Sequence, residues 1–368
     1  MNKFTKEDLK RFQAESLDDK FQRTFANVSE WFSRWNNEVY VSFSGGKDST
    51  VLADICARWC KVVGKPLYLV FVNTGLEYPE IQKHVKFFAQ WLRDKYGIEV
   101  VLEILRPEMR FDEVVKTYGY PVIGKEVSEN VDQARKALER NDGKYTYRLA
   151  KMRGEAVDKN GNPSQFNKQK YEPLLYTDFR SSGACCNVMK KKPTKQYEKK
   201  TGRKPLMATM TAESRLREQS WLKYGCNAFN GKRPRSAPMS FWTEQDVLQY
   251  IKDEQIPLAS VYGKIEYADE PDQMRIEEFG IDGGGRERLS TTGCDRTGCI
   301  FCAFGCHLEK EPSRFQRLKE THPRQYAYCI GGGEYDENGV WKPSKEGLGM
   351  GHVFDELNKI YGDDFIKY

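Results

Sequence analysis

The stretch "YVSFSGGKDSTVL", residues 40–52, decides the fold of this chain. Residues 39–43 are mostly β-branched or aromatic, as in a buried strand, and apolar residues recur at helical spacing over residues 51–62. Gly45 and Gly46 therefore lie on a strand-to-helix turn. Such a turn directs backbone N–H groups and the positive end of a helix dipole at one point, which predicts a phosphate-binding site. The alternative, an ordinary turn that uses glycine for its geometry, leaves the neighbouring lysine and hydroxyls unexplained.

The segments on either side continue the alternation of strand and helix. The patterns predict a helix over residues 17–36, strands over 66–75 and 98–105, and a helix between those strands over 78–97. This alternation is typical of an α/β fold with a doubly wound parallel sheet, which binds ligands at the carboxyl ends of its strands. The polar and basic stretch from about 138 to 172 is expected to be an insertion or a mobile loop.

The composition is that of a globular protein, with 39% hydrophobic and 13% aromatic residues in a chain of 368. No apolar run reaches the roughly 18 residues that a membrane span needs, and the first residues lack the apolar stretch of a signal peptide. We therefore expect a cytoplasmic protein with no membrane partner. In that reducing compartment, ten cysteines indicate metal binding or catalysis rather than disulfides.

The loop at residues 44–49 lacks the Gly-x4-Gly-Lys-Ser/Thr spacing of a Walker loop and matches the pyrophosphatase loop, Ser-Gly-Gly-x-Asp-Ser. Four further stretches occur in the order found in the phosphoadenosine phosphosulfate (PAPS) reductase family, which this chain resembles: "NTGLEYPE" at 73–80, "TYGYPV" at 117–122, "CCNVMKKKP" at 185–193 and "FWTEQDVLQYI" at 241–251. The resemblance covers roughly residues 38–330. It implies an adenine nucleotide alpha hydrolase-like fold, here with a C-terminal cysteine-rich region.

The resemblance also implies roles for individual residues. Lys47 is expected to act on phosphate by its charge and Asp48 to hold Mg²⁺, with Cys306 as a further catalytic candidate. The residues expected to bind ATP are Ser42, Ser44, Gly45, Gly46, Lys47, Asp48, Ser49, Asn73, Thr74, Gly75, Glu213 and Arg217.

Two departures from the family pattern bear on the reaction. The motif Gly-x-Arg-x-x-Glu-Ser appears as "ATMTAES" at residues 208–214, so Met210 stands at the arginine position. The Glu-Cys-Gly-Leu-His motif, whose cysteine attacks sulfur in the reductases, is absent, and Cys306 and Cys329 are the late candidates for such a thiol. The missing motif and the lysine in the phosphate loop favour ATP cleavage over reduction.

The spacing of the cysteines favours a metal site. Cys185 and Cys186 are adjacent, and Cys299 and Cys302 form a Cys-x-x-Cys pair where the iron–sulfur branch of the family has one. Four thiolates are the ligands of a [4Fe–4S] cluster. The alternatives are a zinc knuckle made of Cys294, Cys299, Cys302 and Cys306, and cysteines that serve only in packing.

Lysines and arginines are concentrated in residues 190–204 and 215–235. A solvated helix face is the ordinary explanation for such a run. The alternative is a surface that follows the phosphate backbone of a nucleic acid. The candidate partners are therefore an adenine nucleotide, tRNA or DNA as acceptor, and a sulfur donor protein.

Three functions are compatible with these features. The favoured one is an ATP pyrophosphatase that forms AMP and pyrophosphate and supports sulfur transfer to an acceptor, with a [4Fe–4S] cluster. The alternatives are a sulfonucleotide reductase that releases sulfite, and a non-catalytic nucleic-acid-binding module that retains the fold as a scaffold. The expected organisation is a helical segment at 1–36, a nucleotide domain at 37–258, and a cysteine-rich region at 259–368 that completes the metal site.

Overall fold

The computed structural model describes residues 2–140, 146–231, 233–268 and 288–368. The chain forms two compact units. Unit 1 consists of residues 1–73, 77–105 and 194–297, and unit 2 of residues 74–76, 106–193 and 298–368. The chain therefore leaves unit 1 after its first strands and returns to it about ninety residues later. The sequence-based domain bounds of 37–258 and 259–368 stay a prediction.

Unit 1 contains a six-stranded sheet in the order β3-β2-β1-β5-β7-β6. Its strands are β1 (Val39–Ser42), β2 (Leu67–Val72), β3 (Val100–Leu105), β5 (Lys204–Leu206), β6 (Asn227–Ala228) and β7 (Arg235–Ser236). The pairings β1 with β2, β2 with β3, β1 with β5 and β5 with β7 are parallel, and the edge strand β6 is antiparallel to β7. The predicted α/β class with a mostly parallel sheet is confirmed.

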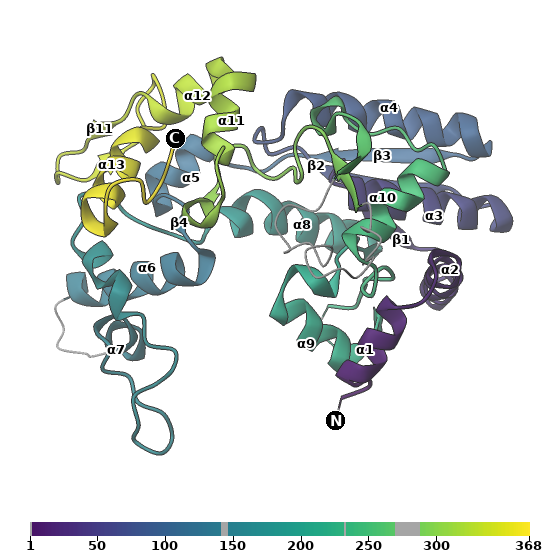
Figure 1. The fold of residues 1–368 in the computed structure, drawn as a ribbon, viewed down its shortest axis with the longest axis horizontal. Helices are drawn as coiled ribbons and strands as arrows, with labels where there is room; N and C mark the ends of the chain where they lie inside the picture. The colour runs from purple at the N-terminus through teal and green to yellow at the C-terminus, as the bar shows by residue number, and fades with distance from the viewer. Residues whose placement is uncertain (1, 141–145, 232, 269–287) are drawn as a thin grey trace, which may run out of the picture. The chain divides into compact units, whose positions relative to one another are not determined.

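Helices α3 (Lys47–Val63) and α4 (Pro79–Tyr96) pack against each other and alongside strands β1 to β3 (Figure 1). In the sheet Val41 lies opposite Leu69, which lies opposite Leu102. The two helices bury the apolar residues that recur at helical spacing, among them Val51, Leu52, Ile55, Ile81, Val85 and Phe88. The predicted alternation of strand and helix is thus confirmed for residues 39–105.

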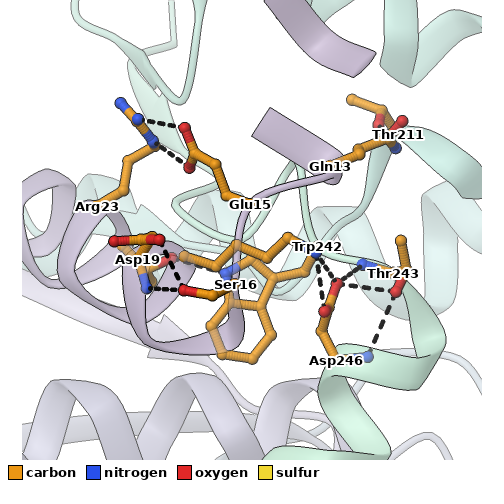
Figure 2. A network of polar contacts seen from close by, with 11 residues as sticks. Gln13, Glu15, Ser16, Asp19, Arg23, Thr211, Trp242, Thr243 and Asp246 are labelled. Atoms are coloured by element: carbon orange, nitrogen blue, oxygen red, sulfur yellow. Dashed lines mark hydrogen bonds and ion pairs between the residues drawn. The ribbon is translucent and has the colours of Figure 1, made fainter. Parts of the chain in front are cut away.

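The N-terminal helices α1 (Lys6–Gln13) and α2 (Leu17–Arg34) belong to the same unit, and α2 is joined to α10 (Glu244–Asp253) by polar contacts (Figure 2). Thr243 caps α10, because its hydroxyl accepts from the N–H of Asp246 while the Asp246 carboxylate accepts from the N–H of Thr243. Lys20 of α2 donates to both carboxylate oxygens of Asp246, at 2.8 and 2.7 Å. Thr243 and Asp246 thus form a capping box, and its acidic residue also fixes α2.

The remaining elements of unit 1 come after the chain has returned to this unit at residue 194. Helix α8 (Lys192–Thr201) leads into β5, and α9 (Arg215–Tyr224) connects the loop after β5 with β6. A short antiparallel pair, β8 (Ile265–Ala268) and β9 (Arg288–Thr291), precedes the cysteine-rich segment.

Unit 2 is mainly helical. Its helices are α5 (Phe111–Tyr118), α6 (Lys125–Arg140), α7 (Tyr147–Arg153), α11 (Arg314–Thr321), α12 (Pro323–Ile330) and α13 (Met350–Tyr361), with a π-helix at Asn187–Lys191. Two small sheets pair β4 (Val122–Ile123) in parallel with β10 (Ala303–Phe304), and β11 (Glu334–Tyr335) with β12 (Trp341–Lys342). Among the residues that the structure describes, no helix is long and apolar enough to cross a membrane.

The stretch 138–172 differs from the expected loop, because α7 lies within it. Leu149 and Met152 of α7 are buried, and the helix packs against α6. Residues 141–145 of this stretch lie outside the described residues. A helix of seven residues offers too few apolar positions for its periodicity to stand out in the sequence.

Candidate active site

A cavity of about 320 Å³, here called the switch-point cavity, lies in unit 1 where β1 and β5 end. These two strands are neighbours, and the later strands β2 and β3 extend the sheet to one side of β1 while β5 lies on the other. Doubly wound sheets bind their ligands where the strand order reverses in this way. The lining residues are Ser42, Ser44, Gly46, Lys47, Asp48, Ser49, Met207, Ala208, Thr209, Glu213, Tyr262, Asp295, Arg296 and Thr297.

The conformation of the loop between β1 and α3 is fixed by hydrogen bonds of its own hydroxyls and by the positive φ of Gly45. Gly45 has φ +74°, and a Cβ there would lie 2.8 Å from Val85 and 2.9 Å from Ile81 of α4. The hydroxyls of Ser44 and Ser49 lie 3.1 Å apart, and Ser49 donates to the carbonyl of Gly46 at 2.9 Å. No side chain caps the start of α3 at Gly46. The helix thus presents its N-terminal backbone, the arrangement that suits phosphate.

The Lys47 amine is buried in the cavity wall and is held by two partners. It donates to a Glu244 carboxylate oxygen at 2.6 Å and to the backbone carbonyl of Asp295. The Lys47 N–H donates to the Tyr262 hydroxyl at 3.2 Å, and that hydroxyl lies 2.7 Å from the Thr297 hydroxyl. The segment 295–297 is therefore bonded directly to the start of the phosphate loop.

Asp48 is the second ionisable group of the loop. Its Oδ1 is buried and has no hydrogen-bond partner among the described residues. Burial raises the pKa of the carboxyl, although Lys47 and Arg296 act to lower it. A carboxylate oxygen held in this way fits a hard cation such as Mg²⁺, because oxygen ligands are those that Mg²⁺ prefers.

The opposite wall comes from the loop after β5. Glu213 accepts from the N–H of Met210 at 2.9 Å, pairs with Arg217, and lies 3.6 Å from an Arg296 nitrogen. Met210, at the arginine position of the family motif, is 3% exposed and belongs to the hydrophobic core. Arg296 brings a guanidinium to the cavity instead. The sequence gives no local signal for this, because Arg296 follows the loop motif by more than eighty residues.

The expected nucleotide-binding residues are only partly brought together. Ser42, Ser44, Gly46, Lys47, Asp48, Ser49 and Glu213 line the cavity. Gly45 packs on α4, Arg217 pairs with Glu213, and Asn73, just after β2, lies outside the cavity lining. Thr74 and Gly75 belong to unit 2. Tyr262, Glu244, Asp295, Arg296 and Thr297 were not expected from the sequence, and all five line the cavity or bind Lys47.

Unit 2 contains the four cysteines expected to bind a cluster. The segment 120–123 pairs with the chain next to each of the two cysteine pairs. Tyr120 N–H donates to the Arg180 carbonyl and the Tyr120 carbonyl accepts from Ser182, just before Cys185 and Cys186. Gly119 makes this possible, since a Cβ there would lie 2.5 Å from the Arg180 carbonyl oxygen. Two residues further on, β4 pairs with β10, which follows Cys299 and Cys302. Both cysteine pairs thus flank residues 120–123.

The charges around these thiols suit an anionic cluster. The sulfurs of Cys185 and Cys186 lie 4.0 Å apart. The pKa of Cys186 is lowered by the hydrogen bond from Cys185 and by Lys125, Lys190 and Lys191. Within the described ranges, no three His, Cys, Asp or Glu side chains are arranged closely enough to hold a metal ion. Four thiols with cations nearby are the kind of donor set that a [4Fe–4S] cluster needs, but the described sulfurs are not gathered around one point.

The other late cysteines are buried. Cys306 is 3% exposed, its thiol donates to the Ala303 carbonyl at 3.1 Å, and burial raises its pKa to about 12. Burial likewise raises the pKa of Cys329, whose sulfur lies 3.4 Å from that of Met350. Both thiols are protonated at neutral pH, which weighs against an attack on sulfur by either. The catalytic role of Cys306 stays a prediction.

Comparisons with known proteins agree with the motif order. The chain matches the family model described as the phosphoadenosine phosphosulfate reductase domain over residues 38–144 and 125–304. The uncharacterized protein MJ0066 of Methanocaldococcus jannaschii is 35% identical over 108 residues, which are 29% of this chain. The chain matches only 20% of the length of that relative.

Two solved structures are similar at low identity. NMN synthetase from Francisella tularensis has a TM-score of 0.32 and 11% identity, over 84% of this chain and 94% of that one. The NH₃-dependent NAD synthetase from Campylobacter jejuni, in complex with nitrate, has a TM-score of 0.29 and 11% identity, over 66% of this chain and 75% of that one. At these TM-scores neither structure carries weight for function.

Proposed function

The chain belongs to the phosphoadenosine phosphosulfate reductase domain family, a family of nucleotide-using enzymes, and we propose that it binds ATP and cleaves it to AMP and pyrophosphate. A nucleophile of the acceptor bonds to the α-phosphorus while the bond from that phosphorus to the bridging oxygen breaks, which releases pyrophosphate. Sulfur from a donor then displaces AMP from the adenylated acceptor. The observation that carries this proposal is the switch-point cavity, which is lined by Lys47 and Asp48 at the start of α3.

The residues of the cavity can perform the binding steps. Backbone N–H groups at the start of α3 would donate to the phosphates. Lys47 would donate to phosphate oxygens after releasing the Glu244 carboxylate and the Asp295 carbonyl. Arg296 adds a second cation at the opposite wall. Charge that develops on the leaving pyrophosphate would be stabilised by these fixed donors.

Asp48 would hold Mg²⁺ through its unpartnered oxygen. When bound, Mg²⁺ neutralises phosphate charge and polarises the phosphoryl oxygens. The raised pKa of Asp48 reflects a carboxylate buried without enough compensating charge, and a bound cation would supply that charge.

Cys185, Cys186, Cys299 and Cys302 would hold a [4Fe–4S] cluster, which supplies electron transfer when bound. The lysines near Cys186 support this assignment, because they favour thiolates. A zinc knuckle with Cys294 and Cys306 is supported less, since the Cys306 thiol is buried and bonded to the Ala303 carbonyl.

Reduction of a sulfonucleotide to sulfite is the second candidate, and the family match favours it. It needs a mobile thiolate to attack sulfur. The burial and raised pKa of Cys306 and Cys329 argue against that step.

The test compares the two reactions directly in anaerobically purified protein. One sample receives ATP with tRNA or DNA, and the other receives PAPS or its 3′-dephosphorylated analogue, both with thioredoxin. We expect AMP and pyrophosphate from the first and no sulfite from the second. Sulfite without AMP would restore the reductase function.

A further inference from the structure

Unit 1 contains a second cavity, of about 230 Å³, between the loop after β5, helix α9 and the β6–β7 hairpin. Met207 and Thr209 line both this cavity and the switch-point cavity, so the loop after β5 forms a common wall. We call it the side cavity. A group bound in it would therefore lie next to the phosphates of a nucleotide in the first.

The side cavity is cationic. Arg217 and Arg235 line it, and none of the described residues in its lining is a carboxylate. Arg235 is exposed and donates to the Ser220 hydroxyl at 2.9 Å, which holds the guanidinium at the cavity. The Nζ of Lys3 would lie 3.6 Å from a Cβ on Gly225, another lining residue.

Arginines and carboxylates meet between the two cavities, and Asp48 acts on Arg217 in addition to Glu213. Glu213 is shared by Arg217 and Arg296, so one carboxylate faces two guanidinium groups there. The pKa of Arg217 is lowered by burial and by Arg296, as expected where positive charges are crowded. Hydroxyls of Thr209, Thr211 and Ser220 complete a lining that can donate to an anion, whereas the Ser240 hydroxyl donates to the Ala237 carbonyl at 2.6 Å.

We propose that the side cavity binds a phosphate group, with its attached sugar, of a nucleic-acid acceptor. This inference rests on the proposed adenylation. The cavity is smaller than the roughly 300–1,000 Å³ of sites that enclose a whole small molecule, so it accommodates one part of a larger ligand. Leu216, 78% exposed at the lining, offers apolar contact to the sugar or base.

A polynucleotide fits better than a small anion because α9, which lines the cavity, carries further basic residues. Arg215 and Lys223 of α9 are exposed, and the same helix contributes Leu216, Arg217, Ser220 and Trp221 to the lining. Polynucleotides bind by neutralising several phosphates in succession. The acceptor would thus follow α9 and present one unit at the side cavity.

The experiment measures binding without turnover. Labelled single-stranded RNA and DNA oligonucleotides of one sequence, and an acidic peptide, are titrated with the full-length protein by fluorescence anisotropy at several salt concentrations. The variants are Arg235→Gln, which removes a charge from the cavity, and Ala228→Leu, which fills it. Arg233→Gln is the matched control, because Arg233 is a nearby exposed arginine that pairs with Glu198 at 2.8 Å and does not line the cavity.

We expect Arg235→Gln to weaken oligonucleotide binding about tenfold and to reduce the salt slope by about 0.7, the value of one single-strand phosphate contact. Ala228→Leu should weaken binding without changing that slope, and Arg233→Gln should change affinity less than about twofold. ATP affinity should stay the same in all three. The RNA and DNA arms identify which polynucleotide is preferred.

Equal effects of Arg235→Gln and Arg233→Gln, full affinity in Ala228→Leu, or tighter binding of the acidic peptide would overturn the inference. So would a parallel loss of ATP affinity, which would make the cavity part of the nucleotide site. Because binding is read without AMP formation, a protein that binds oligonucleotide through Arg235 but forms no AMP contradicts the proposed function alone.

Discussion

Lys47 is the first residue of α3, and only 4% of it is exposed. Its amine already has two hydrogen-bond partners. In the proposed function, phosphate replaces the Glu244 carboxylate and the Asp295 carbonyl as partners of this amine. Replacing Lys47 by Ala removes hydrogen bonds to a charged group worth about 1.5–3 kcal/mol, so the affinity for a non-hydrolysable ATP analogue should fall at least about tenfold in calorimetry.

Glu244→Gln is the matched control, because it keeps the amine and removes its competing charge. This variant should bind the analogue as tightly as the parent or more tightly. The role of Lys47 would be rejected by unchanged affinity in Lys47→Ala, or by an equal loss in both variants.

The buried ring of His84 makes the stability of the protein depend on pH. It stacks on Phe88 at 5.4 Å, and burial lowers its pKa to about 4. An unfolded chain protonates this ring below its ordinary pKa of about 6.5, whereas the folded chain does not until about pH 4. Acidification through this window therefore favours unfolding, by roughly 3 kcal/mol at its lower end.

The measurement is urea unfolding of the parent and of His84→Phe between about pH 8.5 and pH 4. The variant should lose less stability than the parent over this range, and the two should show parallel behaviour above pH 7. Identical pH profiles would show that the pKa of His84 is the same in the folded and the unfolded chain.

At the scale of elements, one ion pair joins α2 to α10. Lys20 is 3% exposed and its partner Asp246 14% exposed, as judged by their side chains. Removing one partner of a buried pair costs about 3 kcal/mol or more, because the other charge stays buried. Lys20→Ala should lower the free energy of unfolding by about 3 kcal/mol in urea denaturation.

Lys6→Ala provides the comparison for this pair. Lys6 lies 3.5 Å from Glu218 and its side chain is 70% exposed, so its removal should cost less than about 1 kcal/mol. Similar losses in the two variants would mean that burial of the Lys20–Asp246 pair has no energetic consequence.

The elements that the sequence predicted are those whose signals are local. Residues 39–105 were predicted because period-2 and period-3.6 patterns lie within each strand and helix. The partners of Lys47 could not be found in this way, since Glu244 and Asp295 lie 197 and 248 residues further along the chain. Nor could the position of Arg296 in the cavity wall be predicted, because only the fold brings Arg296 to Glu213.

At the scale of the whole molecule, the two candidate sites belong to different units. Every residue that lines the switch-point cavity lies in unit 1, and Cys185, Cys186, Cys299 and Cys302 lie in unit 2. The chain connects them directly, because Thr297 in the cavity wall precedes Cys299 by two residues. Separate units predict that each site can be removed by mutation while the other remains.

Cys186→Ser tests this separation. The variant should lose iron and visible absorption, because serine removes one of four thiolate ligands, while its ATP affinity stays that of the parent. Cys329→Ala is the control within unit 2: Cys329 is fully buried against Met350, so its loss should lower stability but leave the iron content unchanged.

Two outcomes would contradict this account. Stoichiometric zinc and no iron in the anaerobic parent would mean that the cysteines form the zinc knuckle instead of the cluster site. A loss of ATP affinity together with iron would show that the cluster supports the nucleotide site, and the two units could then not be treated as independent.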